Sequence, residues 1–152
     1  MSYRDHVDTP LGRMEVCAGD SGITSLNFVE ETSSVNSSSI TDEAIRQINQ
    51  YFDGERRTFN IALDATGTDF QQGVWQALCA IDYGQTCSYQ DIAEAIQNPK
   101  AVRAVGAANG KNPISIIVPC HRVIGANGAL TGYASGVDRK AWLLKHEGSL
   151  LF

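Results

Sequence analysis

Apolar and polar residues alternate along three short stretches near the N-terminus. These stretches, residues 3–8, 12–18 and 23–29, have the two-residue period of half-buried β-strands. The segments between them, Thr9–Gly12 and Gly19–Gly22, are rich in turn-forming residues. Because such short connections join neighbouring strands, we expect a β-meander at the start of the chain.

A change of period follows this meander. Residues 31–39 are polar and rich in serine, which is typical of a surface loop, and Thr41 then opens an amphipathic helix that ends at Gly54. A further short strand is expected near residues 59–63, and residues 64–68 have the composition of a linker. The N-terminal part is therefore predicted to be a small α+β unit.

Helical periods dominate the next part of the chain. From Thr68 a single apolar stripe is formed by Phe70, Val74, Ala77, Leu78 and Ile81. Ser88 and Asp91 resemble the capping box of a second helix, and a third helix is expected over residues 100–108, with Pro99 at its first turn. Two short helices joined by a tight turn fit a helix-turn-helix, although a plain helical hairpin gives the same pattern.

The C-terminal part contains clearer signals of turns and of the ends of elements. The β-branched run at residues 114–118 predicts a buried strand that leads directly to the sequence Pro-Cys-His-Arg-Val at residues 119–123. Asn127 and Gly128 are a hairpin signal, and Asp138 is expected to cap a last helix.

Composition places the chain among ordinary globular proteins. It has 152 residues, 43% of them hydrophobic and 19% charged, which suits one domain or two small ones. No apolar run approaches the ~18 residues needed to span a bilayer, and no basic leader is present, so we expect no membrane partner. Four cysteines without a CxxC pair favour a reducing compartment, and the protein is predicted to be cytoplasmic.

The net charge of −5 is unevenly distributed. Residues 1–97 contain five arginines against fifteen acidic residues, a net charge of −10. Residues 98–152 contain seven Lys and Arg against two acidic residues, a net charge of +5. The total therefore does not exclude a nucleic-acid partner for the C-terminal part.

Cys120 is the strongest chemical candidate. It directly precedes His121 and Arg122, a cationic setting that favours the nucleophilic thiolate. Adjacent residues of an extended chain point in opposite directions, so contact between the thiol and the imidazole requires a tight turn or a bridging water. From composition alone, the more common interpretation of Cys120 is a small buried apolar residue, which is the role of most cysteines.

The motif around Cys120 is one of several ordered blocks. It is preceded by Asn112-Pro113 and followed by Gly132-Tyr133-Ala134-Ser135-Gly136 and Glu147-Gly148. Upstream blocks are Phe70–Trp75, Ser88–Ala93 and Arg103–Gly106. In this order and spacing, residues 68–148 strongly resemble the O6-alkylguanine-DNA alkyltransferases, the methylated-DNA–protein-cysteine methyltransferases.

The resemblance implies a fold and an activity. The fold would be α+β, with a ribonuclease-H-like N-terminal domain over residues 1–66 and a helical, winged-helix-like C-terminal domain over residues 67–152 that contains a helix-turn-helix. The activity would be the irreversible transfer of an alkyl group from O6-alkylguanine, and from O4-alkylthymine, in double-stranded DNA to one protein sulfur. No cofactor or metal is implied, since the zinc ligands of some family members are not matched here, and a monomer is expected.

The resemblance also implies roles for individual residues. Cys120 would accept the alkyl group, His121 would remove its proton through a water, Glu147 would orient His121, and Asn112 would hold the active-site turn. Tyr89 would meet the flipped base, Arg103 would fill its place in the duplex, and the carbonyls of Cys120 and Val123 would receive the guanine amino group. The remaining pocket residues would be Tyr133, Ala134 and Ser135, where Ser135 replaces the usual glycine and leaves the preferred alkyl size open.

Each of these residues also has an ordinary structural interpretation. Glu147 fits a solvated helix end, Asn112 a turn before proline, and Arg103 an exposed helix charge. Two other functions remain open on the residues: a helix-turn-helix sensor or regulator that binds damaged DNA without reacting, and a cysteine hydrolase built on Cys120 and His121.

Overall fold

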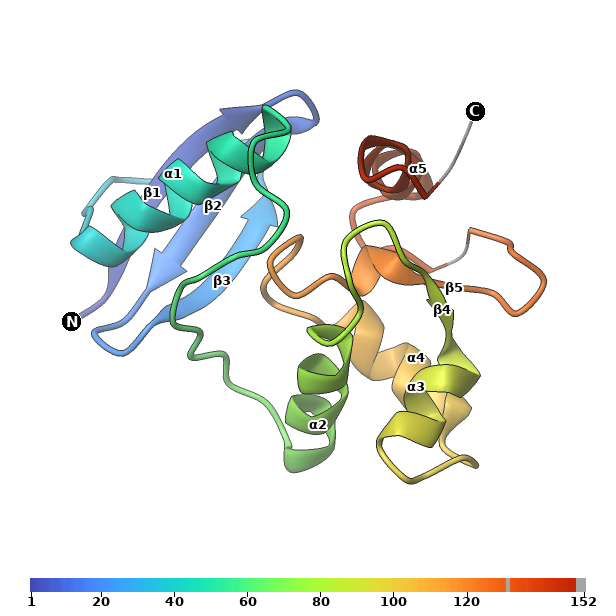
Figure 1. The fold of residues 1–152 in the computed structure, drawn as a ribbon. Helices are drawn as coiled ribbons and strands as arrows, with labels where there is room; N and C mark the ends of the chain where they lie inside the picture. Colours follow the sequence, from blue (N-terminus) through green and yellow to red (C-terminus); the bar gives the residue numbers. More distant parts are fainter. Residues whose placement is uncertain (131, 150–152) are drawn as a thin grey trace. The chain divides into compact units, whose positions relative to one another are not determined.

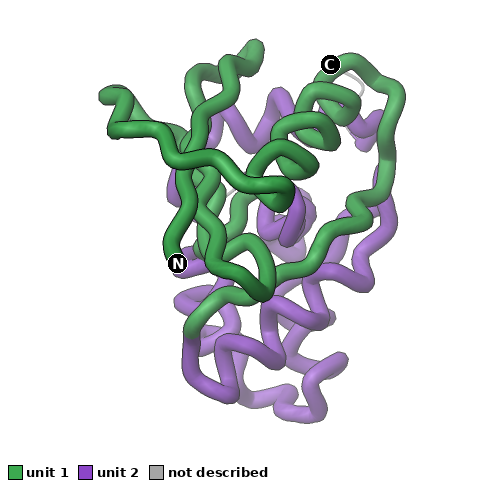
Figure 2. Tube along the Cα trace, turned by 90° about the vertical axis from the view of Figure 1, so that its left-hand side faces the viewer, with its two compact units in different colours: residues 1–66, 113–115 green, residues 67–112, 116–152 purple. Residues whose placement is uncertain are grey.

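The structure is a computed structural model that describes residues 1–130 and 132–149. Residue 131 and the last three residues of the predicted C-terminal domain lie outside the described residues. The chain divides into two compact units, residues 1–66 with 113–115 and residues 67–112 with 116–152 (Figure 2). The short segment 113–115 thus belongs to the first unit although it lies far along the sequence.

The first unit contains the predicted meander. Strands β1 (Tyr3–Thr9), β2 (Gly12–Ala18) and β3 (Ile23–Phe28) form an antiparallel sheet in the order β1-β2-β3, which confirms all three predicted strands. In this register Val7 faces Met14, so the apolar positions of neighbouring strands share one side of the sheet.

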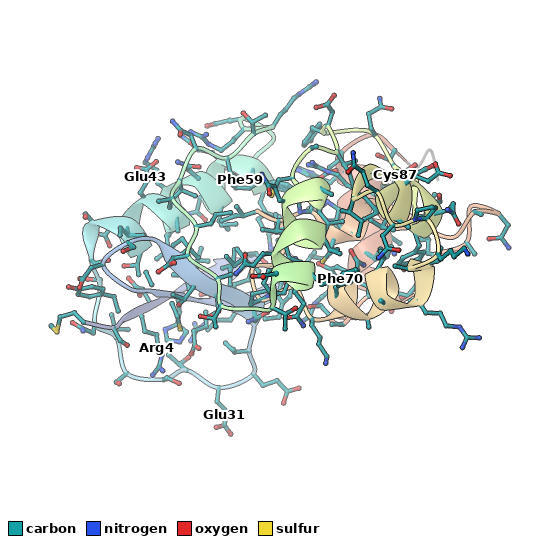
Figure 3. The ribbon with its side chains drawn as sticks, turned by 90° about the horizontal axis from the view of Figure 1, so that it is seen from below. Arg4, Glu31, Glu43, Phe59, Phe70 and Cys87 are labelled. Atoms are coloured by element: carbon teal, nitrogen blue, oxygen red, sulfur yellow. The ribbon has the colours of Figure 1, made fainter. Side chains whose placement is uncertain are left out.

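Helix α1 (Ser39–Phe52) covers the apolar side of the sheet (Figure 1). The helix starts two residues before the predicted Thr41, because the side chain of Ser38 caps it and Thr41 closes the capping box. The core of the unit consists of fully buried side chains, which include Met14, Val16, Ile23, Leu26, Ala44 and Ile48. Arg4, on the alternate positions of β1, points to the side of the sheet away from α1 (Figure 3).

Two predicted strands are wrong. Residues 59–63 form no strand and pair with the sheet only at Leu63, in a single parallel bridge to Ile23. Residues 114–118 pair only at Ile114, which bridges to Leu26, and the chain then turns at once. Ile116 has a φ of 72°, which no strand permits and which a β-branched residue rarely adopts. Burial of this segment was predicted correctly, but its conformation was not.

The second unit begins with three helices, of which the last two form the predicted pair of short helices. Helix α2 (Asp69–Leu78) is followed by the short strand β4 (Cys87–Ser88), by α3 (Tyr89–Ala95) and by α4 (Val102–Gly110). The predicted cap of α3 is confirmed, since Ser88 and Asp91 form a reciprocal capping box. Helix α4 starts two residues later than predicted, and Pro99 lies in the turn before it instead of in its first turn.

The end of the chain holds the remaining elements. A short 3-10 helix, η1 (Cys120–Arg122), leads into β5 (Val123–Ile124), which pairs in parallel with β4. Asn127 and Gly128 form the expected turn, which the amide of Gly125 closes by donating to the carbonyl oxygen of Ala129 at 2.8 Å. The pairing of a hairpin beyond this turn would involve residue 131, which lies outside the described residues. Helix α5 (Val137–His146) is preceded by Gly136 with a φ of 102°, so Asp138 lies in its first turn and is not its cap. None of the helices in the described part of the chain is long and apolar enough to cross a membrane.

Candidate active site

Cys120 lies in a tight turn that the second unit holds from several directions. Its amide donates to the carbonyl oxygen of Val118 at 2.8 Å, and the Nδ2 atom of Asn112 donates to the same oxygen, also at 2.8 Å. The turn therefore depends on the side chain of Asn112, which lies six residues before Val118 and just after the end of α4. Cys120 itself is 6% exposed.

His121, the residue after Cys120, forms a buried pair with Glu147. His121 is fully buried, and its Nε2 atom lies 2.8 Å from Oε2 of Glu147, the residue that follows α5. An ionised carboxylate can only accept, so Nε2 carries the proton and Nδ1 of the neutral ring keeps its lone pair. Nδ1 has no hydrogen-bond partner among residues 1–130 and 132–149. The ring is thus oriented as a base.

Arg122 is a site residue to which the sequence assigned only a general positive charge. Its Nε and Nη2 atoms donate to the two carboxylate oxygens of Glu147 at 2.8 and 3.1 Å. A third donor, Nη1, reaches the carbonyl of Ile81 at 2.7 Å. This bidentate contact fixes the plane of the carboxylate, which in turn fixes the imidazole of His121. In the sequence, the position of Arg122 next to His121 was the only indication that it belongs to the site.

Lys140 is a second residue that sequence reasoning missed. Its side chain is completely buried in α5, and Nζ donates to the carbonyl oxygen of Val123 at 2.5 Å. A lysine is almost never fully buried without a partner, and the positive charge of Lys140 also acts on Cys120. A polar residue at an apolar position of the last helix was the signal that pointed to it.

The ionisation of the site follows from burial and these contacts. Burial raises the pKa of the Cys120 thiol, while a hydrogen bond from Asn112 and the charge of Lys140 oppose this shift. Burial lowers the pKa of His121, against the influence of Glu147. Burial would raise the pKa of Glu147, but its hydrogen bonds to His121 and Arg122 prevail and lower that pKa to about 2. The resting site therefore holds a neutral thiol, a neutral imidazole and a carboxylate.

Tyr89 reaches the loop that the sequence placed at the same pocket. A side-chain carbon added to Gly132 would lie 3.3 Å from the Tyr89 hydroxyl, and Gly132 has a φ of 61°. One added to Gly106 of α4 would lie 3.9 Å from the Tyr89 ring. The first distance would be a tight contact and the second an ordinary van der Waals contact, so only Gly132 is needed to make room for the Tyr89 hydroxyl. Tyr133, the residue after Gly132, is buried.

The other predicted site residues have different environments. Val123 is fully buried, Ala134 is exposed, and the carbonyl of Ser135 accepts a hydrogen bond from Arg139 at 3.3 Å. Arg103 is exposed on α4. Cys120, His121, Glu147 and Asn112 are thus brought together, whereas Arg103 lies on the outer side of its helix.

This arrangement is suited to nucleophilic chemistry at sulfur. A thiol at the start of a turn, an oriented neutral imidazole and a carboxylate that stabilises the imidazolium are the parts that such chemistry requires. Burial raises the pKa of the thiol and so favours its protonated form. The geometry alone fits both group transfer and hydrolysis.

Two family models together match almost the whole chain. Residues 69–149 match the DNA binding domain of 6-O-methylguanine DNA methyltransferase, and residues 2–65 match its ribonuclease-like domain. A methylated-DNA–protein-cysteine methyltransferase of Methanosarcina acetivorans is 50% identical over 149 residues, which cover 93% of this chain and 96% of the relative. The protein of that name from Mycobacterium tuberculosis H37Rv is 49% identical, over 94% of this chain and 90% of the relative.

Solved structures agree with these matches. The crystal structure of the M. tuberculosis O6-methylguanine methyltransferase has a TM-score of 0.89 at 47% identity, over 98% of this chain and 94% of that one. A complex of the M. tuberculosis protein OGT with DNA has a TM-score of 0.86 at 50% identity, over 95% of this chain and 91% of that one. These structures have the α+β architecture described above, with a small antiparallel sheet followed by a helical part.

Proposed function

Because the chain belongs to the 6-O-methylguanine DNA methyltransferase family, we propose that Cys120 is the acceptor in its direct repair of alkylated DNA. The protein binds DNA and reverses the damage by moving an alkyl group from a base to one of its own cysteines. The observation that carries the assignment to Cys120 is its buried position directly before His121, whose Nε2 atom lies 2.8 Å from Oε2 of the buried Glu147.

We infer that O6-alkylguanine is the principal substrate, with O4-alkylthymine as a second one. Sulfur attacks the alkyl carbon, an S–C bond forms, and the C–O6 bond breaks with its electron pair left on the base. The thiol proton passes through a water to Nδ1 of His121, and Glu147 stabilises the resulting imidazolium. The thioether is stable, so each protein molecule reacts once.

The leaving base needs its own stabilisation. Negative charge develops on the guanine ring as the C–O bond breaks, and we propose that the hydroxyl of Tyr89 donates to N3 of the base. We further propose that the carbonyls of Cys120 and Val123 accept the 2-amino group and that the amide of Ala134 donates to O6. Tyr133, which is buried, would form a wall of the pocket, and Ser135 would lie beside it in place of the family's usual glycine, which leaves the preferred alkyl size open.

Access to O6 requires the base to leave the stack. The alkyl group lies inside the duplex, and base flipping costs a few kcal/mol, less for a weakened pair. We propose that α4 enters the minor groove, where its small residues permit close approach, and that Arg103 fills the vacated place. Residues 67–152 would thus carry both DNA binding and transfer, with residues 1–66 as a separate domain and the protein acting as a monomer in the cytoplasm.

A single titration tests this proposal. The protein is incubated under reducing conditions with a duplex that contains O6-methylguanine, and its peptides are weighed by mass spectrometry. One methyl group on the Cys120 peptide, with one equivalent of DNA repaired, is the expected result. A Cys120→Ser variant should bind the duplex without repairing it.

Other outcomes identify the two alternatives. Binding without any mass gain would indicate a damage sensor, and repair that continues beyond one equivalent would indicate turnover. Repair by Cys120→Ser would place the acceptor elsewhere.

A further inference from the structure

Tyr83 lies in the loop between α2 and β4 and has no part in the mechanism above. Its ring packs against the guanidinium of Arg122, whose Cζ atom is 5.7 Å from the ring centroid. Its hydroxyl donates to the backbone carbonyl of His146, the last residue of α5, at 3.3 Å. One partly buried side chain thus touches both Arg122 and the helix end that carries Glu147, the carboxylate to which Arg122 donates.

The rest of this loop makes two further contacts with the same charged pair. The carbonyl of Ile81 accepts from Nη1 of Arg122 at 2.7 Å. Gly84 has a φ of 84°, and a side-chain carbon added there would lie 3.2 Å from the backbone oxygen of Glu147. Glycine at this position therefore allows the loop to approach Glu147 closely in a left-handed conformation. Residues 81–84 thus pack against the pair and do more than connect two elements.

The aromatic ring of Tyr83 supplies a contact that the hydrogen bonds of Arg122 cannot. Hydrogen bonds from a planar guanidinium act in its plane and leave its faces uncovered. The face of an aromatic ring attracts such a cation within about 6 Å of the ring centroid, most strongly where water is excluded. The side chains of Arg122 and Glu147 are 8% and 0% exposed, so water is largely excluded from the pair. The ring therefore helps to keep the guanidinium on the carboxylate.

The contacts of Tyr83 converge on one carboxylate. We propose that Tyr83 is a positioning residue that holds the Arg122–Glu147 pair in the alignment that orients the imidazole, and so sets the rate of alkyl transfer and not the affinity for DNA. This inference rests on the proposed function, in which His121 takes the proton of Cys120. Tyr83 touches neither of these two residues in the reaction and acts only through the carboxylate, so its loss matters only while that carboxylate is present.

The test separates the rate of transfer from the affinity for DNA. Single-turnover transfer from a duplex that contains O6-methylguanine is measured over a range of DNA concentrations, which gives a maximal rate and a half-saturating concentration. Tyr83→Leu removes the ring and should lower the maximal rate about tenfold, the size of one partly desolvated cation–π contact, with the half-saturating concentration unchanged. Tyr83→Phe keeps the ring and should lose about twofold or less.

A second substitution shows whether Tyr83 acts through Glu147. In a Glu147→Gln background the imidazole has already lost its carboxylate, so the addition of Tyr83→Leu should slow transfer by less than about twofold. Tyr83→Met removes the ring with a more adaptable apolar side chain, and the unfolding temperature of each variant shows whether it folds. Tyr3→Leu removes a partly exposed tyrosine of the first unit, whose hydroxyl donates to Asp20 at 3.0 Å, and should change neither quantity.

Each alternative outcome overturns the inference. An unchanged maximal rate in Tyr83→Leu and Tyr83→Met would show that the ring does not matter for transfer. A further loss of about tenfold in the Glu147→Gln background would show that Tyr83 acts independently of the carboxylate. A Tyr83→Phe variant as slow as Tyr83→Leu would exclude the ring as the cause, and a change in the half-saturating concentration alone would make Tyr83 a DNA contact. Absence of any transfer by wild type would instead refute the proposed function itself.

Discussion

Glu147 carries a negative charge at the C-terminal end of α5, where the helix dipole makes such a charge unfavourable. Three hydrogen bonds from His121 and Arg122 offset this. The residue therefore links the base of the reaction to a guanidinium that does not itself touch the reacting atoms. At this scale, one carboxylate determines both the orientation of His121 and part of the stability of the fold.

Replacement of Glu147 by Gln should slow alkyl transfer and should also reduce the loss of folding stability at low pH. We expect transfer to slow about a hundredfold, because His121 loses the partner that stabilises its imidazolium. The folded-state pKa of Glu147 is about 2 against 4.5 in the unfolded chain, so its contribution is present above pH 4.5 and is lost as the pH falls toward 2.

Denaturation by urea at several pH values measures this contribution. Between pH 5 and pH 2, wild type should lose about 3 kcal/mol more stability than Glu147→Gln. If the free energy of unfolding fell equally with pH in both proteins, the conclusion that Glu147 is ionised in the folded protein would be wrong.

Lys140 offers a second prediction at the residue scale. Its charge lowers the pKa of Cys120, so Lys140→Met should raise that pKa and slow transfer about tenfold at pH 7. The rate should recover at higher pH, which a purely structural defect would not produce. Lys145→Met, on the exposed side of the same helix, is the matched control and should leave the pH profile of transfer unchanged.

Among the elements, α3 and the turn at Cys120 matter most for the site. Helix α3 has seven residues, too few for stability in isolation, and it carries Tyr89 as its first residue. Its capping box fixes the point where the helix starts and hence the direction of Tyr89. The turn at Cys120 is held in a similar way, by Asn112 from outside the segment.

The Ser88→Ala variant tests the importance of the cap. Loss of the bond from the Asp91 amide to Ser88 should destabilise the protein by about 1 kcal/mol, measured by urea denaturation. We also expect slower transfer at low DNA concentration, because Tyr89 loses its fixed position. Ser88→Thr keeps the capping oxygen and should behave as wild type, and an equally slow Ser88→Thr would disprove the capping explanation.

At the scale of the whole molecule, charge is divided between the two parts of the sequence. The net charge of +5 over residues 98–152 suits phosphate, whereas the net charge of −10 over residues 1–97 does not. A few phosphate contacts predict modest affinity that falls steeply with salt.

Salt titrations of DNA binding test this division. The logarithm of the binding constant should fall by about 0.9 per phosphate contact for each tenfold increase in salt. Lys100→Ala and Lys111→Ala, both at exposed positions, should each reduce this slope by about 0.9, as followed by fluorescence anisotropy. Asp42→Asn, exposed on α1, should leave it unchanged, and a slope that changes equally in all three variants would disprove the division.

The sequence by itself determined the features that depend on local pattern. The three N-terminal strands and the cap of α3 could be predicted, because alternation and capping are contained in neighbouring residues. The catalytic candidates came from the resemblance of ordered motifs over residues 68–148 to a known family, and their roles stay predictions. The burial of residues 114–118 was equally visible in their composition.

Tertiary structure decided what depends on distant partners. Residues 114–118 do not form the predicted strand. Ile114 pairs with Leu26 of the first unit, and the turn at Val118 that follows is held by the side chain of Asn112. Arg122 and Lys140 belong to the site only because the fold brings Glu147, at the end of α5, to Arg122 and brings Lys140 of α5 to Val123. Propensity acts over a few residues, whereas hydrogen bonds and burial depend on whichever residues the fold brings together.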